Sequence, residues 1–364
     1  MKKIVFIGHA TPDGVRLIKI AKILKEKNYN LEFVGWSRDK NDICPDETYD
    51  NITTLMRGGG ERTRILPILY IWFIIKLFFY LLLKKDIKKK LVYAINSDVA
   101  IAVWGASCIK KFEYVYDIWD ELAMSHNFPG FIRSLLMKID AKARKKSAFY
   151  IHVDENRVSH LDTGNENYVI IYNSPFDTKQ NNKTPEYENS FAVTGWLNNT
   201  RGLSSIYAFA KNHPQFNFIV AGEFLQKENR ILFQSLSNVK LHPFMPQEQL
   251  FELIKNCRGI FSLYDASIPI NRMAASNKLY DAMMLSIPVI VNKEILAADF
   301  VTKNGVGFVV DYEYSSSWEC LVNANLEMIQ TMGKKGRELY LNRFEFRHMV
   351  ESILLPRLAV LVVD

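Results

Sequence analysis

The chain has 364 residues, a formal net charge of +7 and 48% hydrophobic residues. This length is sufficient for two domains with full cores, and 23% charged residues with 17 Gly and 12 Pro exclude a disordered chain, a collagen and a repeat array. The four cysteines lie far apart without a C-x-x-C pair, which is typical of a reduced protein with no zinc knuckle. The first apolar run is too short for a signal peptide, so we expect an initial strand and a cytoplasmic protein.

Apolar strands alternate with helical patterns in the first half of the chain. The pattern predicts a helix over 131–146 with a basic C-terminal end, and strands at 3–8, 31–36, 91–95, 99–104, 113–117 and 149–153. This alternation indicates a parallel sheet covered by helices.

A polar stretch after Pro175 separates this half from a second alternation. There we expect helices at 203–212, 247–256 and 277–285, and strands at 191–195, 216–222, 239–244, 259–263, 287–291 and 307–310. We therefore predict an α/β fold of two Rossmann-like domains, 1–174 and 175–343, that face each other across a cleft, with a helix at 344–364 packing back on the first domain.

The most hydrophobic segment, 65–83, has 19 residues and one charge, Lys76. Three interpretations are open: a helix at the membrane interface, a helix buried against the sheet, or a span, which the mid-helix lysine disfavours. The helical wheel assigns Ile71, Ile74, Phe78 and Leu81 to the core, and an interfacial face to Trp72, Phe73, Lys76, Phe79 and Tyr80.

A lysine cluster directly follows this segment, and we expect it to face anionic lipid: Lys84, Lys85, Lys88, Lys89 and Lys90. Lys and Arg are nowhere interleaved with aromatics as in a nucleic-acid groove, so we expect no nucleic-acid partner.

Candidate phosphate-binding residues follow predicted strands in both halves, where loop amides and helix N-termini attract anions. Gly14 and Arg16 follow the first strand, although Gly14 equally suits an ordinary helix start. Neither G-x-G-x-x-G nor a P-loop motif occurs, which disfavours NAD enzymes and P-loop NTPases.

In the second half, Arg201 precedes a helix and is suited to hold a diphosphate, the alternative being a solvated loop arginine. Lys278 begins another helix, and Asp281 lies one turn later, where a carboxylate accepts hydrogen bonds from ribose hydroxyls or merely favours the helix dipole.

These segments resemble glycosyltransferase family 4, a group of retaining, nucleotide-sugar-dependent enzymes with the glycosyltransferase-B (GT-B) fold. Asp13-Gly14-Val15-Arg16 is similar to the family's G-x-x-R loop, and the segment 116–120 (YDIWD) to its Y-D-x-H-E segment. The segment 195–202 is similar to G-R-L…K-G, and 278–290 to K-L-x-E-A-M…G-x-P-V-[IV], the most specific of the four.

The resemblance implies a role for each matching residue. Arg201 and Lys278 would hold the donor diphosphate, Asp281 would orient the nucleoside, and amides near Gly14 and Arg16 would approach the diphosphate. Asn277, Leu279 and the backbone near Phe244 would make further contacts with the donor. Asp120 would position or deprotonate the acceptor hydroxyl.

Three positions depart from the family pattern: Trp196 replaces an arginine, Met273 a glutamate and Trp119 a histidine. No D-x-D triplet occurs, so we predict neither a metal nor a cofactor, only a UDP, GDP or dTDP sugar as co-substrate.

We hypothesise a metal-independent hexosyltransferase on the inner face of the cell membrane. Its acceptor would be a lipid-linked or surface-polysaccharide intermediate of capsule, O-antigen or exopolysaccharide synthesis. The rivals are an epimerase or phosphorylase of the same fold, which has no use for a membrane face, and a catalytically silent member that binds a glycan or a partner transferase.

Overall fold

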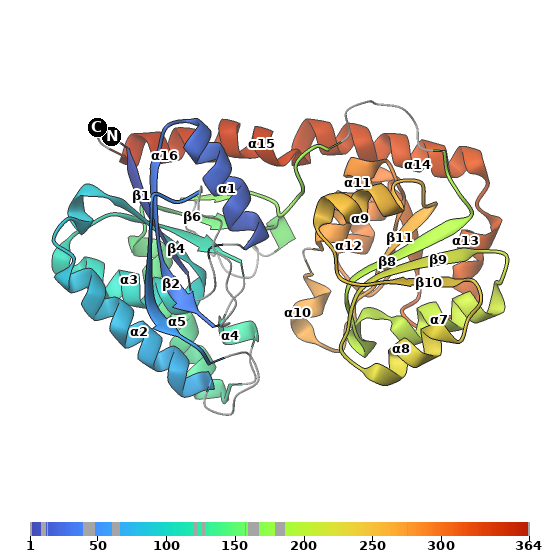
Figure 1. Ribbon diagram of the computed structural model, residues 1–364, viewed down its shortest axis with the longest axis horizontal. Coiled ribbons are helices and arrows are strands. Elements are labelled where there is room, and N and C mark those ends of the chain that lie inside the picture. The colour runs from blue at the N-terminus through green and yellow to red at the C-terminus, as the bar shows by residue number, and fades with distance from the viewer. Residues whose placement is uncertain are drawn as a thin grey trace. The chain divides into compact units, whose positions relative to one another are not determined.

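The computed structural model describes residues 2–8, 12, 14–38, 48–59, 66–119, 122–125, 128–156, 158, 167–178, 186–274 and 276–362. The chain forms two compact units (Figure 1). Unit 1 comprises Met1–Tyr172 and Arg347–Asp364, and unit 2 comprises Asn173–Phe346.

Unit 1 contains a parallel sheet whose described strands follow the order β3-β2-β1-β4-β5-β6-β7. Every residue of β4 and β5 is buried, as expected for central parallel strands covered on both faces. The strands are β1 (Lys3–Gly8), β2 (Asn30–Ser37), β3 (Asn51–Arg57), β4 (Leu91–Ile95), β5 (Tyr114–Ile118), β6 (Phe149–His152) and β7 (Tyr168–Ile170).

The helices of unit 1 bury their apolar faces against this sheet. Phe73 and Leu77 of α2 join Val99 and Val103 of α3 and Tyr116 of β5 in one core. The helices are α1 (Val15–Glu26), α2 (Leu66–Leu83), α3 (Asn96–Lys110), α4 (Leu122–Ser125), α5 (Gly130–Lys146) and α16 (Leu355–Leu361), with a 3₁₀ turn at Ile87–Lys89. None of the described helices is long and apolar enough to cross a membrane.

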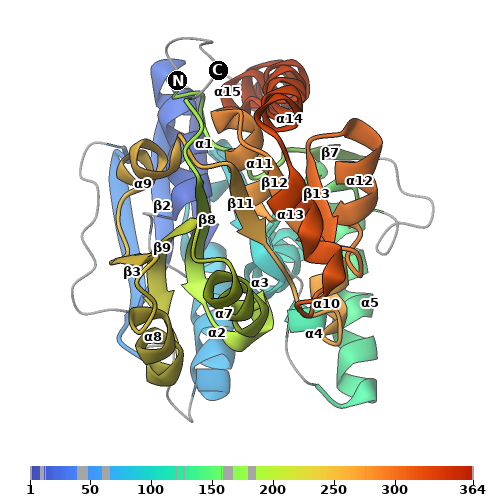
Figure 2. The same cartoon turned by 90° about the vertical axis from the view of Figure 1, so that its right-hand side faces the viewer.

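Unit 2 contains a second parallel sheet in the order β10-β9-β8-β11-β12-β13, whose strands lie side by side in Figure 2. Its strands are β8 (Ser190–Leu197), β9 (Asn217–Phe224), β10 (Val239–His242), β11 (Gly259–Ser262), β12 (Val289–Asn292) and β13 (Gly307–Val310). Phe191, Phe209, Phe261 and Trp318 belong to its core, where the rings of Phe191 and Phe209 meet edge to face and those of Phe261 and Trp318 are stacked with their centroids 5.5 Å apart.

The helices of unit 2 connect these strands. They are α7 (Leu203–Asn212), α8 (Lys227–Gln234), α9 (Gln247–Ile254), α10 (Pro269–Arg272), α11 (Asn277–Leu285), α12 (Ala297–Asn304), α13 (Glu319–Asn323) and α14 (Leu326–Leu339). The 3₁₀ turns at Asn199–Arg201 and Ser316–Trp318 and the π-helical segment Tyr340–Phe344 complete the unit, and α15 (Phe346–Met349) leads into the π-helical Val350–Leu354 of unit 1. The two Rossmann-like halves expected from the sequence are therefore confirmed.

Three secondary-structure expectations were wrong or incomplete. The expected strand at 99–104 lies within α3, because a short apolar run in a fully buried helix has the same composition as a buried strand. Strand β3 was not predicted: Gly35 pairs with Thr54 and Trp36 with Met56, so Leu55 is an extra residue in a bulge, and the strand sequence NITTLMR has no apolar alternation. Strand β7 has only three residues.

The buried face of α2 also differs from the helical-wheel expectation. Phe73 is fully buried and was wrongly assigned to the lipid side, whereas Ile71 is 60% exposed and was wrongly assigned to the core. Tyr80 is half-buried. Because the helix packs on β3 as well as on α3, its apolar contacts turn toward Phe73, Leu77 and Leu81.

Lys90 was wrongly grouped with the lipid-facing lysines. It is 7% exposed, and its Nζ lies 2.6 Å from Glu32 and 2.5 Å from Asp86. Two carboxylates thus hold this ammonium in the fold, while Lys85, Lys88 and Lys89 remain exposed.

A buried ion pair joins α1 to the centre of the unit 1 sheet. The guanidinium of Arg16, 3% exposed, donates from Nε and Nη2 to the two oxygens of Asp117, each at 3.1 Å. Its Nη1 donates to the carbonyl of Ile171 at 2.8 Å, and the hydroxyl of Tyr93 donates to Asp117 Oδ2. Burial beside Asp117 raises the pKa of Tyr93, so this hydroxyl remains a donor.

We predict that Arg16→Met destabilises unit 1 by about 3–5 kcal/mol, because Asp117 then keeps a buried, unpaired charge. Urea unfolding would measure the loss. The matched control is Lys22→Met, an exposed position on α1, with an expected change within about 0.5 kcal/mol. The double variant Arg16→Met/Asp117→Leu should be more stable than Arg16→Met alone. If its loss of unfolding free energy equals the sum of the losses of Arg16→Met and Asp117→Leu, the ion-pair account is contradicted.

Candidate functional site

The strand order of unit 2 reverses between β8 and β11. The chain runs from β8 outward to β9 and β10, then returns to β11 on the other side of β8 and continues to β12 and β13. At such a switch point the connections that follow the two strands run in opposite directions, and a crevice forms between them at the carboxyl ends of the strands. The loops after Leu197 and Ser262 border this point.

The loop after β8 is held in a fixed turn. Asn198 Oδ1 accepts hydrogen bonds from the amide and hydroxyl of Thr200 at 2.9 and 2.7 Å. Gly202 adopts a φ of +68°, and its amide donates to the hydroxyl of Tyr312, which in turn donates to the carbonyl of Asn199 at 2.9 Å. These bonds fix the backbone that carries Arg201.

The loop after β11 is tied to its neighbours in the same way. Asn292, fully buried at the end of β12, accepts from the amide of Tyr264 at 2.8 Å and donates to its carbonyl at 3.0 Å. The amide of Asp265 donates to the carbonyl of Thr200 at 3.0 Å. Tyr264 therefore has a rigid backbone beside the turn that carries Arg201.

Two cations lie on the ring of Tyr264. The guanidinium carbon of Arg201 is 4.0 Å from the ring centroid, and the ammonium of Lys278 is 6.0 Å from it. Arg201 Nη1 is buried without a hydrogen-bond partner, and neither cation has a carboxylate within ion-pair distance among the described residues. Two unneutralised cations at a switch point form a candidate site for an anion.

The N-terminus of α11 belongs to the same site. Ser276 makes no side-chain cap; its hydroxyl lies 2.7 Å from the buried Ser262 Oγ instead. The positive end of the helix dipole is thus available beside Lys278. Gly195 is part of the same arrangement, because a Cβ on its backbone would lie 3.7 Å from Lys278 Nζ.

The other predicted donor residues of unit 2 occupy neighbouring positions. Asn277 is exposed at the first turn of α11, and Leu279 is buried behind it. Asp281 accepts a hydrogen bond from Gln247 Nε2 of α9 at 3.4 Å, and Phe244 is 70% exposed in the loop between β10 and α9. Their contacts with a nucleoside stay predictions.

The residues predicted in unit 1 are less closely grouped. Gly14 precedes α1 with a φ of −52° and lies against Trp119, since a Cβ there would be 3.6 Å from that ring. Arg16 is not available to a diphosphate, because Asp117 and Ile171 occupy its guanidinium, so its assignment to the donor was wrong. Asp120 lies outside the described residues, two positions before the first residue of α4 in the sequence.

Sequence reasoning missed Tyr264 and Asn292. The only signal for either is position, since Tyr264 lies two residues past β11 and Asn292 ends β12. Trp196, which replaces the arginine of the family pattern, is 60% exposed at the end of β8.

Comparison with known proteins supports the fold through similar structures. No family model matches the chain, and no curated protein matches it. Sucrose-phosphate synthase from Thermosynechococcus elongatus superimposes with a TM-score of 0.72 at 13% identity, covering 99% of this chain and 100% of that one.

Two further solved structures are similar over nearly the whole chain. HepE from Anabaena, in complex with UDP, gives a TM-score of 0.70 at 15% identity, covering 98% of this chain and 99% of that one. The lipopolysaccharide outer core galactosyltransferase WaaB gives a TM-score of 0.62 at 11% identity, covering 97% of this chain and 99% of that one. The chain therefore has the fold of the GT-B glycosyltransferases.

We predict that Gly202→Ala destabilises unit 2 by about 1–3 kcal/mol and weakens anion binding at Arg201. A Cβ at φ +68° is strained and would lie 2.7 Å from Leu263 Cδ1, so the turn must shift. Thermal unfolding and phosphate titration would measure both effects. Gly130→Ala is the control, because a Cβ at Gly130 would meet nothing within 4 Å; equal effects of the two changes would contradict the role of the turn.

Proposed function

We propose that the chain is a glycosyltransferase that transfers a sugar from a nucleoside-diphosphate sugar. The observation that carries this proposal is the pair of unneutralised cations, Arg201 and Lys278, on Tyr264 at the switch point of unit 2. HepE, which has the same fold, has been crystallised with UDP and with UDP-glucose, so UDP is the first nucleotide to test.

The chemistry follows from the charge that develops on the leaving group. As the bond between the anomeric carbon and the diphosphate oxygen breaks, negative charge accumulates on the diphosphate, and fixed cations and helix amides stabilise it. Arg201 suits a bidentate contact and Lys278 a point contact beside the α11 N-terminus. The acceptor hydroxyl attacks the anomeric carbon and loses its proton, and we propose that Asp120 accepts this proton. We also propose that the anomeric configuration of the sugar is retained.

We propose that Asp281 and the loop at Phe244 orient the nucleoside. Asp281 lies one turn after Lys278 on α11, and Phe244 is exposed in the loop before α9. The diphosphate cations come from this chain, so we propose that transfer requires no metal and no cofactor other than the nucleotide sugar.

We also propose that the acceptor is lipid-linked and that unit 1 docks on the cytoplasmic face of an anionic membrane. One face of α2 carries an unbroken apolar stripe at helical spacing, each member at least 41% exposed: Ile68, Ile71, Trp72, Ile75, Phe79 and Leu83. Lys76 lies 5.5 Å from the Trp72 ring and Lys84 5.6 Å from the Tyr80 ring, so cations border this stripe.

Further cations follow at the end of α2. Lys88 and Lys89 are exposed and line a groove of about 690 Å³ with Lys3 and Lys111. An apolar stripe next to several unpaired lysines matches an anionic bilayer surface better than it matches a protein of mixed charge. WaaB acts on lipopolysaccharide, which supports an acceptor anchored in a membrane.

A catalytically silent binder is the second candidate function. The observation that favours it is the exposed indole of Trp196 at the end of β8, where the family pattern has an arginine. An aromatic ring at this point suits stacking on a sugar. Failure to bind any nucleoside diphosphate would favour this alternative.

We predict that one of UDP, GDP and dTDP raises the unfolding free energy by about 2.7 kcal/mol at 100 times its dissociation constant. Arg201→Gln and Lys278→Gln should each weaken its binding about tenfold or more, because each removes a charge-assisted contact. Thermal unfolding with each nucleotide measures this.

The control for this nucleotide experiment is Arg230→Gln, an exposed arginine on α8 that should leave binding unchanged. A selective nucleotide whose affinity is the same in Arg201→Gln, Lys278→Gln and Arg230→Gln would contradict the diphosphate site.

We predict that Trp72→Ser/Phe79→Ser lowers binding to phosphatidylglycerol vesicles at least tenfold, since two large apolar side chains no longer enter the interface. Vesicle flotation measures the bound fraction. Ile231→Ser/Leu232→Ser is the matched control on α8, where both side chains are also exposed. Wild-type protein that does not float, or equal losses in the two double variants, would refute membrane docking by α2.

A further inference from the structure

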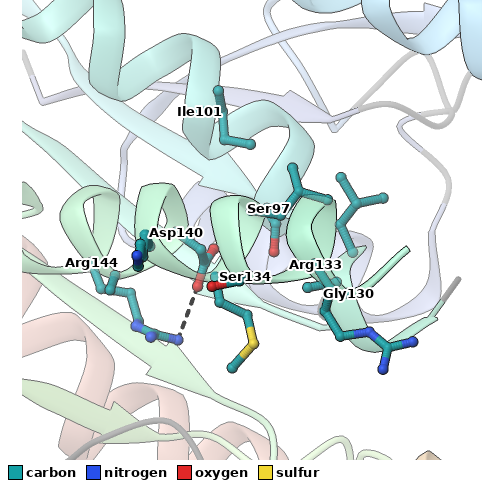
Figure 3. Close-up of a pocket in the computed structure, with 13 residues that line it drawn as sticks. Ser97, Ile101, Gly130, Arg133, Ser134, Asp140 and Arg144 are labelled. Carbon is teal, nitrogen blue, oxygen red and sulfur yellow. Dashed lines mark ion pairs between the residues drawn. The ribbon is translucent and has the colours of Figure 1, made fainter. Parts of the chain in front are cut away.

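A cavity lies in unit 1, on other elements than the cations of unit 2. It has a volume of about 420 Å³ and is lined by residues of α3, α4 and α5 (Figure 3). Ser97 follows β4 and Leu122 follows β5, so one end of the cavity lies at the carboxyl edge of the unit 1 sheet. This edge of a parallel sheet is where ligands bind.

Part of the polar lining is already neutralised within the protein. Arg144 Nη1 lies 2.9 Å from Asp140 Oδ2, and the buried hydroxyl of Tyr116 donates to Asp140 Oδ1 at 2.6 Å and lies 2.9 Å from Ser97 Oγ. Burial raises the pKa of Tyr116, so this hydroxyl stays protonated as a donor. These residues form an ion-paired and hydrogen-bonded network at one end of the cavity, in which the charge of Arg144 is balanced by Asp140.

Arg133, at the other end, is not satisfied. Its Nε is buried, and within the described part of the chain its side chain has no hydrogen bond and no ion pair. In Figure 3 Arg133 and Arg144 lie at opposite ends of the lining, with Ser134 between them. Lys138 also lines the cavity, so two cations remain after Arg144 is paired with Asp140. A buried guanidinium nitrogen without a partner favours an anionic ligand.

The rest of the lining is apolar. The apolar members are Ile101, Leu122, Ala123, Leu136, Met137 and Ala141. A ligand that satisfies the whole surface has an anionic group at Arg133 and a hydrocarbon group along α5.

We propose that this cavity binds the phosphate of a lipid-linked acceptor, with Arg133 on the phosphate and the start of the lipid chain along Met137 and Ile101. The proposal rests on the proposed transferase function and its lipid-linked acceptor, for which it assigns the binding site. The same phosphate chemistry occurs in soluble sugar phosphates, but those have no group to place against the apolar lining.

The test measures calorimetric affinities of the full-length protein for farnesyl phosphate, farnesol and inorganic phosphate. Farnesyl phosphate should bind at least tenfold more tightly than either part alone. Arg133→Gln should weaken it about tenfold, Arg133→Lys should restore part of the loss, and Lys142→Gln, an exposed charge on α5 outside the cavity lining, should change it less than twofold.

Two results would overturn the acceptor site. Inorganic phosphate that binds as tightly as farnesyl phosphate would identify a soluble phosphate ligand, and equal effects of Arg133→Gln and Lys142→Gln would refute the contact with Arg133. Affinities for UDP, GDP and dTDP are measured on the same samples. Unchanged binding of the preferred nucleotide in Arg133→Gln shows that the variant is folded, and absence of binding of all three nucleotides in wild type refutes the proposed donor site independently of the farnesyl phosphate result.

Discussion

The account depends on two like charges held against one aromatic ring. Arg201 and Lys278 lie on Tyr264, and the protein places no carboxylate against either of them in the part that the structure describes. Cation–π contact offsets part of the cost of their proximity, and an anion offsets the rest. The surrounding hydrogen bonds from Asn198, Asn292 and Tyr312 fix the backbone that carries Arg201 and Tyr264. The proposed diphosphate site thus has its arginine and its aromatic ring in place before a ligand binds.

The two units use the same topology for different purposes. Both sheets reverse their strand order beside their first strand, β1 or β8, and both place polar residues at the carboxyl edge. In unit 2 that edge carries unpaired cations. In unit 1 Arg16 is paired with Asp117 and stabilises the fold, whereas the side chain of Arg133 on α5 has no hydrogen bond and no ion pair among the described residues. A cation that the protein has already neutralised contributes to stability, whereas one that it has not neutralised contributes to binding.

The sequence predicted the fold well because both halves repeat the strand–helix period, and it predicted Arg201 and Lys278 because each follows a buried strand at a helix start. It failed where periodicity carries no information. The run at 99–104 is buried in a helix, a bulge disrupts the pattern of β3, and the partner of Arg16 lies 101 residues away in the chain. Tyr264 and Asn292 were missed for the same reason, because their roles arise only when the loops after β8, β11 and β12 meet.

A crystal structure of the protein with UDP tests the central claim most directly. The account predicts diphosphate oxygens within hydrogen-bond distance of both the Arg201 guanidinium and the Lys278 ammonium, beside the N-terminus of α11. A UDP molecule bound with its diphosphate elsewhere, with Arg201 and Lys278 unchanged on Tyr264, would contradict the account.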